Sequence, residues 1–155
     1  MVALPLFLAL PIMIAAGFTD LRQLRIPNFL VMLALILFVL TCPLLPLAEI
    51  QTRLLAGIVT LAVGFGLFCL GVWGGGDAKL LPALVIFIPG QSLTLFAYIL
   101  SASILIGTLS IITYRKVGLN GPAEWVGAHA SGRFPMGISI AMAGIAHAVA
   151  LTFFW

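Results

Sequence analysis

The stretch Trp73-Gly74-Gly75-Gly76-Asp77-Ala78-Lys79-Leu80 places one of the chain's four acidic residues between two long apolar runs. Glycines lack a Cβ atom, so three in succession let the backbone turn tightly and let another group approach it closely. Asp77 then stands at the start of the next apolar segment, where a helix dipole stabilises a carboxylate and burial beside lipid opposes it. Asp77 is therefore either an acid with tunable proton affinity or an ordinary helix cap after a glycine hinge.

The composition indicates an integral membrane protein. Of 155 residues, 63% are hydrophobic and only 7% are charged, which is far from the composition of soluble globular domains. The apolar runs have lengths of roughly 17 to 23 residues, enough for a helix to cross a hydrocarbon core of about 30 Å. A β-barrel would need short alternating segments instead. We therefore expect an all-α bundle of about six transmembrane helices that forms one domain over residues 1–155.

The expected spans are residues 2–19, 28–47, 53–72, 77–89, 92–113 and 135–155. The first run lacks the basic residues that open a secretory signal, so we expect it to remain as a helix. The fourth run covers only about 20 Å at the helical rise of 1.5 Å per residue. It either crosses a thin part of the bilayer with a tilt, or begins inside the protein where glycine-rich backbone lines a polar cavity.

Polar residues and prolines mark the expected connections. Pro27 should stop the helix before it and Asn28 should cap the next one. Glu49 and Arg53 suggest a short polar turn, and residues 114–134 form the one sizeable loop. Small residues that recur along two spans predict close helix packing: Gly57, Gly64 and Gly71 in the third span, and Gly137, Ala141, Gly144 and Ala148 in the sixth.

The cysteines and histidines show no metal-binding or disulfide pattern, so we predict no metal and no other cofactor. Cys42 and Cys69 lie in or beside apolar runs without a second pair and are expected to be small buried residues. His129 lies in the polar loop, and His147 lies alone in the last span, where an ionisable residue usually faces the bundle interior. The tryptophans suit an aromatic belt at the membrane interfaces: Trp73, Trp125 and Trp155.

The basic residues assign the two sides of the membrane. They gather in the connections 20–27, 73–79 and 114–134, which six spans would place on one face, whereas the other face carries only Arg53. By the positive-inside rule the first face is cytoplasmic and both termini point outward. The net charge of +3 therefore reports orientation, not nucleic-acid binding. Asp20 and Asp77 would then meet at the cytoplasmic boundary, far from Glu49.

Two carboxylates brought close together titrate as a unit, because one keeps a proton while the other stays charged. The charged member can activate water, and the neutral member can protonate a carbonyl oxygen or a leaving amine, as in aspartic proteases. The chain has no Gly-x-Ser-x-Gly elbow, no His-Glu-x-x-His zinc helix and no phosphate-binding loop. Acid–base chemistry by Asp20 and Asp77 is thus the reaction type that the motifs favour.

Three motifs resemble those of the type IV prepilin peptidases, a family of GxGD membrane aspartic peptidases. Gly74-Gly75-Gly76-Asp77-Ala78-Lys79-Leu80 resembles the GxGD motif, and Asp20-Leu21-Arg22-Gln23-Leu24-Arg25-Ile26-Pro27-Asn28 resembles the first aspartate motif. Phe134-Pro135-Met136-Gly137 is similar to a Pro-aromatic-Gly element of the family's last helix, with Met136 at the aromatic position. The family's peptidase core is six helices and little else, so the resemblance extends over most of the chain.

The resemblance implies an inner-membrane aspartic endopeptidase that removes the basic leader from type IV prepilins or pseudopilins at the cytoplasmic face. Its partners would be a substrate with a basic leader and an apolar helix, and the lipid bilayer. Asp20 and Asp77 would be the catalytic pair. The supporting motif residues would be Gly74, Gly76, Lys79, Arg25, Pro27 and Asn28. Lys79, Arg22 and Arg25 are expected as interfacial anchors or orientation signals, with tuning of the aspartates as the alternative.

Larger family members also N-methylate the new amino terminus through an insertion that carries two CxxC pairs. This chain has only residues 23–28 in that region and no CxxC motif, so we expect peptidase activity without the methyltransferase. The small size resembles the short forms that serve tight-adherence (Flp-type) pili.

Two rival hypotheses remain open. A small proton- or ion-coupled carrier would use Asp20 and Asp77 to bind the ion, because intramembrane acids often mark ion paths. A purely structural bundle would use the same residues as helix caps. A carrier should hold its acids near the bilayer midplane, whereas a peptidase needs them near one face with access for an unwound peptide.

Overall fold

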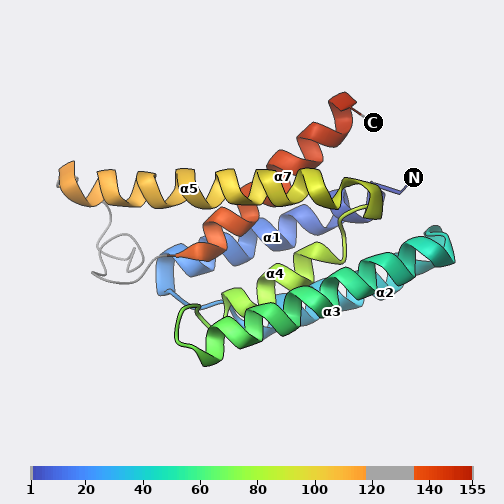
Figure 1. The fold of residues 1–155 in the computed structure, drawn as a ribbon, viewed down its shortest axis with the longest axis horizontal. Helices are drawn as coiled ribbons and strands as arrows, with labels where there is room; N and C mark the ends of the chain where they lie inside the picture. The colour runs from blue at the N-terminus through green and yellow to red at the C-terminus, as the bar shows by residue number, and fades with distance from the viewer. Residues whose placement is uncertain (1, 118–134, 155) are drawn as a thin grey trace.

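The structure, a computed structural model, describes residues 2–117 and 135–154, and these form helices with no strand among them (Figure 1). The helices are α1 (Leu4–Gln23), α2 (Asn28–Thr41), α3 (Leu47–Cys69), α4 (Asp77–Val85), α5 (Leu93–Val117) and α7 (Met136–Phe154), with short 3₁₀ turns η1 (Cys42–Leu44) and η2 (Gly90–Ser92). The all-α prediction is confirmed. The fifth helix runs to Val117, a little beyond the expected residue 113, so the predicted start of the large loop at 114 was too early.

Four helical stretches are long and apolar enough to cross a membrane: Leu4–Gln23, Leu47–Cys69, Gly90–Tyr114 and Met136–Phe153. The stretch Asn28–Leu44 is apolar but shorter, and α4 has only 9 residues. The chain is therefore an all-α membrane protein.

The helices run back and forth, so the connections separate to two ends (Figure 1). The start of α1, the end of α7, the turn between α2 and α3 and the turn between α4 and α5 lie at one end. The connection from α1 to α2, the glycine-rich connection from α3 to α4 and the end of α5 lie at the other. The segments 24–27 and 70–76, remote in sequence, are therefore neighbours in the fold.

The short helix α4 is the centre of the bundle. Residues 77–89 are all buried except Lys79, and α4 packs against α3, α7, α2 and α1. Pro82 lacks an N–H group for the helical ladder. After Val85 the chain continues in tighter turns, with Phe87 N and Ile88 N donating to carbonyls three residues back. The expected helix over 77–89 therefore ends early, but the segment is the most enclosed part of the chain.

Small residues set the close approach of α7 to its neighbours, as predicted. A Cβ atom built on Gly17 of α1 would lie 2.9 Å from the Cβ of Ala141, and one on Gly144 would lie 3.2 Å from Leu84 Cδ1 of α4. Gly137 and Ala148 are buried on the same helix. Without side chains in the way, α1, α4 and α7 form one tightly packed core.

The predicted glycine stripe on the third span is only partly correct. Gly57 and Gly64 are buried on α3, where an added Cβ would lie 2.5 Å from Ile86 Cγ2 and 3.4 Å from Ala78 Cα, respectively. Gly71 lies beyond the end of α3 with φ +72°, a left-handed conformation that glycine adopts without strain. Gly71 thus turns the chain toward the glycine-rich connection and packs against no helix.

The predicted polar turn at Glu49 and Arg53 is wrong, because both residues lie in the first turns of α3. Arg53 Nε donates to Glu49 Oε2 at 2.9 Å, a spacing of four residues that suits a helix. The fully buried guanidinium also donates to the carbonyls of Val2 (2.7 Å) and Phe87 (3.2 Å). Glu49 accepts a further bond from Gly90 N at 3.3 Å. Arg53 therefore ties the chain start, α3 and the α4–α5 connection together.

Candidate active site

Asp20 lies within α1, one turn before its end, and not at the end itself as the sequence suggested. The helix continues through Arg22 and Gln23 because polar residues do not interrupt a helix, and a basic side chain suits its last turn. Leu24 then adopts a left-handed conformation (φ 50°), and its N–H donates to the carbonyl of Asp20 at 2.8 Å. This cap turns the chain sharply toward Pro27.

The carboxylate of Asp20 is held by the start of the last helix. Asp20 is 6% exposed, and its Oδ2 accepts a hydrogen bond from Gly137 N at 2.8 Å. A Cβ on Gly137 would lie 2.8 Å from Asp20 Cβ and 2.9 Å from Oδ2, so only glycine leaves room for this contact. The first N–H groups of a helix lack partners within the helix, and a carboxylate is a natural acceptor for one.

Asp77 is the first residue of α4 and does not act as a helix cap. The N-cap position is Gly76, and no side chain caps the helix. Asp77 is 8% exposed, and its Oδ1 has no hydrogen-bond partner among the described residues. A Cβ on Gly74 would lie 2.8 Å from Asp77 Oδ2, so this glycine makes room for the carboxylate. An ordinary capping role for Asp77 is thereby ruled out.

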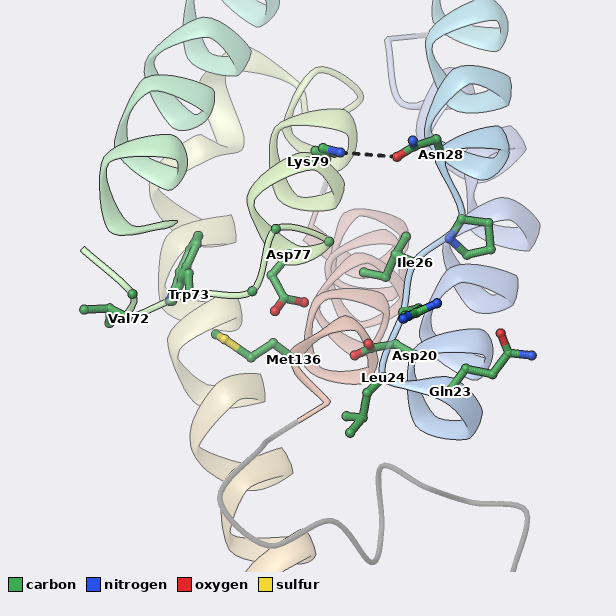
Figure 2. A pocket seen from close by; sticks show the side chains of 16 residues that line it. Asp20, Gln23, Leu24, Ile26, Asn28, Val72, Trp73, Asp77, Lys79 and Met136 are labelled. Atoms are coloured by element: carbon green, nitrogen blue, oxygen red, sulfur yellow. Dashed lines mark hydrogen bonds between the residues drawn. The ribbon is translucent and has the colours of Figure 1, made fainter. Parts of the chain in front are cut away.

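Asn28 also has a role other than the predicted cap. It is the first residue of α2, and no side chain caps that helix. Its Oδ1 accepts a hydrogen bond from Lys79 Nζ at 3.3 Å, which joins the α1–α2 connection to α4 (Figure 2). Both residues belong to the predicted motifs, and the contact brings the two motifs together.

Both aspartates point into one cavity of about 1030 Å³ between the two connections (Figure 2). The wall of this aspartate cavity includes every predicted site residue: Asp20, Arg25, Pro27, Asn28, Gly74, Gly76, Asp77 and Lys79. The structure therefore brings together the two segments that span counting placed on one face. The cavity is large enough for an extended stretch of peptide, and the glycine-rich backbone forms part of its wall.

The two carboxyl groups differ in their surroundings. Asp77, outside the four long helices, has its pKa raised to about 7 by burial, and the negative charge of Asp20 acts in the same direction. The Gly137 N–H favours negative charge on Asp20, whereas Asp77 Oδ1 has no such donor. At neutral pH the pair can therefore hold a single proton, which Asp77 is the better placed to carry.

A model of the Type IV leader peptidase family matches residues 7–112, about two thirds of the chain. The chain belongs to this family. The match runs from α1 into α5 and contains both Asp20 and Asp77. Neither the curated proteins nor the solved structures compared with the chain match it.

Gly137 is the residue of this leader peptidase that the sequence did not assign to the site. The glycine was predicted as a packing residue and as part of an element that resembles the family's last helix, but not as a partner of Asp20. Its N–H donates to Asp20 Oδ2 from outside the part of the chain that the family model matches. Its position directly after Pro135-Met136, at the start of a helix, was the sequence feature that could have indicated a free N–H group for a carboxylate. Of the element Phe134-Pro135-Met136-Gly137, Phe134 lies outside the described residues, and Met136 lines the aspartate cavity.

Arg22 and His147 contact other groups than the aspartates. Arg22 stacks on Phe18, with Cζ 4.5 Å from the ring centre, and has no ion pair with either aspartate within residues 2–117 and 135–154. His147 faces the interior as expected, with Nε2 3.0 Å from Ser92 Oγ, although its Nδ1 has no partner among the described residues. Trp73 lines the aspartate cavity. The predictions for Trp125, His129 and Trp155 fall outside the described residues.

Proposed function

We propose that the protein is a membrane-embedded aspartic endopeptidase that removes the basic leader from type IV prepilins or pseudopilins, with Asp20 and Asp77 as its catalytic pair. The supporting observation is the shared aspartate cavity, into which both carboxylates point and whose wall contains the other motif residues. Membership of the Type IV leader peptidase family supports peptidase chemistry and a prepilin-type substrate.

The geometry favours distinct roles for the two acids. Charged Asp20, held by Gly137 N–H, accepts a proton from water as the water oxygen bonds to the scissile carbonyl carbon. Protonated Asp77 gives its proton to the carbonyl oxygen, and the carbonyl carbon becomes the centre of a tetrahedral intermediate. Asp20 then returns the first proton to the leaving nitrogen, the C–N bond breaks, and Asp77 recovers its own proton as the new carboxyl group forms. Each acid ends in its starting protonation state.

The substrate and the membrane orientation follow from the charges at this end of the bundle. Arg22 lies in the last turn of α1, at the same end of the bundle as the aspartates, and Arg25 and Lys79 line the aspartate cavity. By the positive-inside rule we place the opening of this cavity on the cytoplasmic side of a bacterial inner membrane. A prepilin held by an apolar helix, with its basic leader in the cytoplasm, presents its scissile bond at this depth. Residues 1–155 act as one domain of six membrane passes with both termini outside.

The absence of CxxC from residues 23–28 supports peptidase activity without N-methylation, as in the short forms that serve Flp-type pili. The carrier hypothesis is less consistent with the positions of the acids. Asp20 lies one turn from the end of α1, and Asp77 opens α4, so neither lies at the middle of its helix. A coupled ion site would favour the midplane instead.

The test is leader removal by the purified protein in lipid, with a prepilin as substrate. Asp20→Asn and Asp77→Asn should each reduce the cleavage rate by on the order of 10²-fold to 10⁴-fold, because each removes one proton-transfer group. Glu49→Gln makes the same chemical change at the opposite end and should retain cleavage. A metal chelator should have no effect, since the mechanism uses only carboxyl groups. Retained cleavage in either Asn variant would refute the pair.

A further inference from the structure

A second hollow, of about 360 Å³, lies on the bundle between α3 and α5, with α4 at its base. On α3 it is lined by Ala56, Val59, Thr60 and Val63, which recur at the i, i+3, i+4, i+7 spacing of one helix face. Val59 and Val63 are exposed, so this face of α3 has no complete cover from the described chain. We call this hollow the lateral groove.

The facing wall on α5 repeats the same spacing. Leu93, Phe96, Ala97 and Leu100 line it, while Leu81 and Val85 of α4 form the base. Each of these two rows of lining residues forms a stripe along its helix that extends over two helical turns, about 11 Å at 1.5 Å per residue. Alanines on both walls, at 56 and 97, project little into the groove and leave room for another helix to approach closely.

The chemistry of the lateral groove selects an apolar occupant. Its only side-chain hydroxyl belongs to Thr60, whose Oγ1 donates to the carbonyl of Ala56 at 2.7 Å within the same helix. No side chain on the two helical walls therefore offers a free donor to a partner, and among the lining side chains only Trp73, at the end of the groove, carries an N–H group. An occupant that enters here within lipid must satisfy its own backbone groups, and a peptide does so only as a helix.

Trp73 connects the lateral groove to the aspartate cavity, because its side chain lines both. The indole packs over α3, where a Cβ on Gly64 would lie 3.6 Å from its Cζ3. The groove and the aspartate cavity therefore meet at Trp73, which lies on the Asp77 side of the aspartate cavity (Figure 2). A chain that leaves the groove past Trp73 enters the space into which both carboxylates point.

We infer that the lateral groove between α3 and α5 is the docking site for the apolar helix of the peptide substrate, which enters it as a helix and unwinds past Trp73 toward Asp20 and Asp77. This inference rests on the proposed function. The paired helical stripes, the small residues and the continuity with the aspartate cavity favour a helix over a lipid acyl chain. Binding in the groove fixes the register, because the scissile bond must follow the docked helix directly.

Photo-crosslinking at Ala97 tests the inference. A photoreactive side chain replaces Ala97 in one sample and Ala102 in another; both alanines are exposed on α5, but only Ala97 lines the groove. With prepilin in liposomes, position 97 should form a covalent adduct with the prepilin's apolar helix, and position 102 should not. A synthetic copy of that helix without the leader should compete. Adducts with lipid alone at position 97, or equal prepilin adducts at both positions, would overturn the inference.

Kinetics provide a second measurement. Ala97→Trp fills the groove and should raise the KM for full-length prepilin about tenfold with little change in kcat, the pattern expected when uniform binding is lost. Ala102→Trp should behave like the unmodified protein. An unchanged KM in Ala97→Trp would overturn the inference that the groove is the docking site. If Asp20→Asn and Asp77→Asn abolish cleavage while the groove variants have no effect, only the groove fails. If either Asn variant still cleaves, the proposed function fails, and the inference falls with it.

Discussion

At the scale of single residues, the site depends on two glycines that leave space for carboxylates. Gly74 lies against Asp77 and Gly137 lies against Asp20, and a Cβ at either position would approach a carboxylate oxygen within 3 Å. The first of these was visible in the sequence as part of a glycine run before an acid. The second was not, because its partner lies 117 positions away and the contact exists only once α1 and α7 pack together.

Gly137→Ala should therefore reduce the cleavage rate strongly while it lowers the melting temperature only a little. The added methyl group displaces Asp20 and breaks its bond to the Gly137 N–H, so we expect cleavage to fall by on the order of 10²-fold. Gly144→Ala on the same helix is the matched control, since its Cβ would meet only flexible side-chain ends, of Leu84 at 3.2 Å and of Leu10 at 3.9 Å. Cleavage rates and melting temperatures of both variants check this, and equal activity in the two would remove Gly137 from the site.

The burial of Asp77 predicts a pH-dependent stability. Its pKa rises from 3.8 to about 7 in the fold, so the native state keeps a proton that the unfolded chain has released. The stability that follows from this raised pKa is fully present below about pH 4 and is lost as the pH rises through about 7. Asp77→Asn should weaken this dependence and raise the melting temperature at pH 8 by roughly 3 °C or more. Thermal unfolding at pH 5 and pH 8 measures it; an identical pH dependence in both proteins would contradict the assigned proton.

At the scale of helices, hydropathy identified each apolar segment, but polar residues misled the placement of the ends. Asp20 and Gln23 lie inside α1, and Glu49 and Arg53 lie inside α3, although the sequence placed helix ends at both points. A polar side chain affects which surroundings suit a residue, but it does not break a helix. The local feature that ends α1 is the left-handed Leu24 ahead of Pro27. The partners that let Arg53 be buried are far away in sequence, so no local pattern could reveal them.

Arg53→Met should be strongly destabilising without direct damage to the aspartate cavity. The change removes the bonds to the Val2 and Phe87 carbonyls and leaves Glu49 without its partner, which costs about 3 kcal/mol and lowers the melting temperature by roughly 5 °C or more. Cleavage below the melting transition should persist. The double variant Arg53→Met with Glu49→Gln should be more stable than the sum of the single losses predicts, since the orphaned charge is gone. Strict additivity would show that the pair is not coupled.

At the scale of the whole molecule, span parity was the strongest long-range inference that the sequence allowed. Counting the expected spans placed Asp20 and Asp77 at the same end of the bundle, and in the structure both aspartates line one cavity. The lateral groove was beyond sequence reading. Its walls come from α3 and α5, whose separation depends on how the short helix α4 fits between its neighbours.

The orientation of the bundle is the last prediction. Arg53 is fully buried and pairs with Glu49, so it adds little to the charge that faces the membrane surface on its side. Arg22 and Lys79, in contrast, are exposed at the aspartate end. This strengthens the charge asymmetry beyond the plain count of arginines and lysines. The aspartate end should therefore be cytoplasmic.

Two matched glutamines can measure this orientation in membrane vesicles. Gln23 and Gln51 are both exposed, one beside the aspartate cavity and the other near the start of α3 at the opposite end. In a background where both free cysteines, Cys42 and Cys69, are replaced by serine, Gln23→Cys should react with an impermeant maleimide only in inside-out vesicles, and Gln51→Cys only in right-side-out ones. The reverse pattern would place the carboxylates outside the cell, away from a cytoplasmic leader, and leader removal could not then be their reaction.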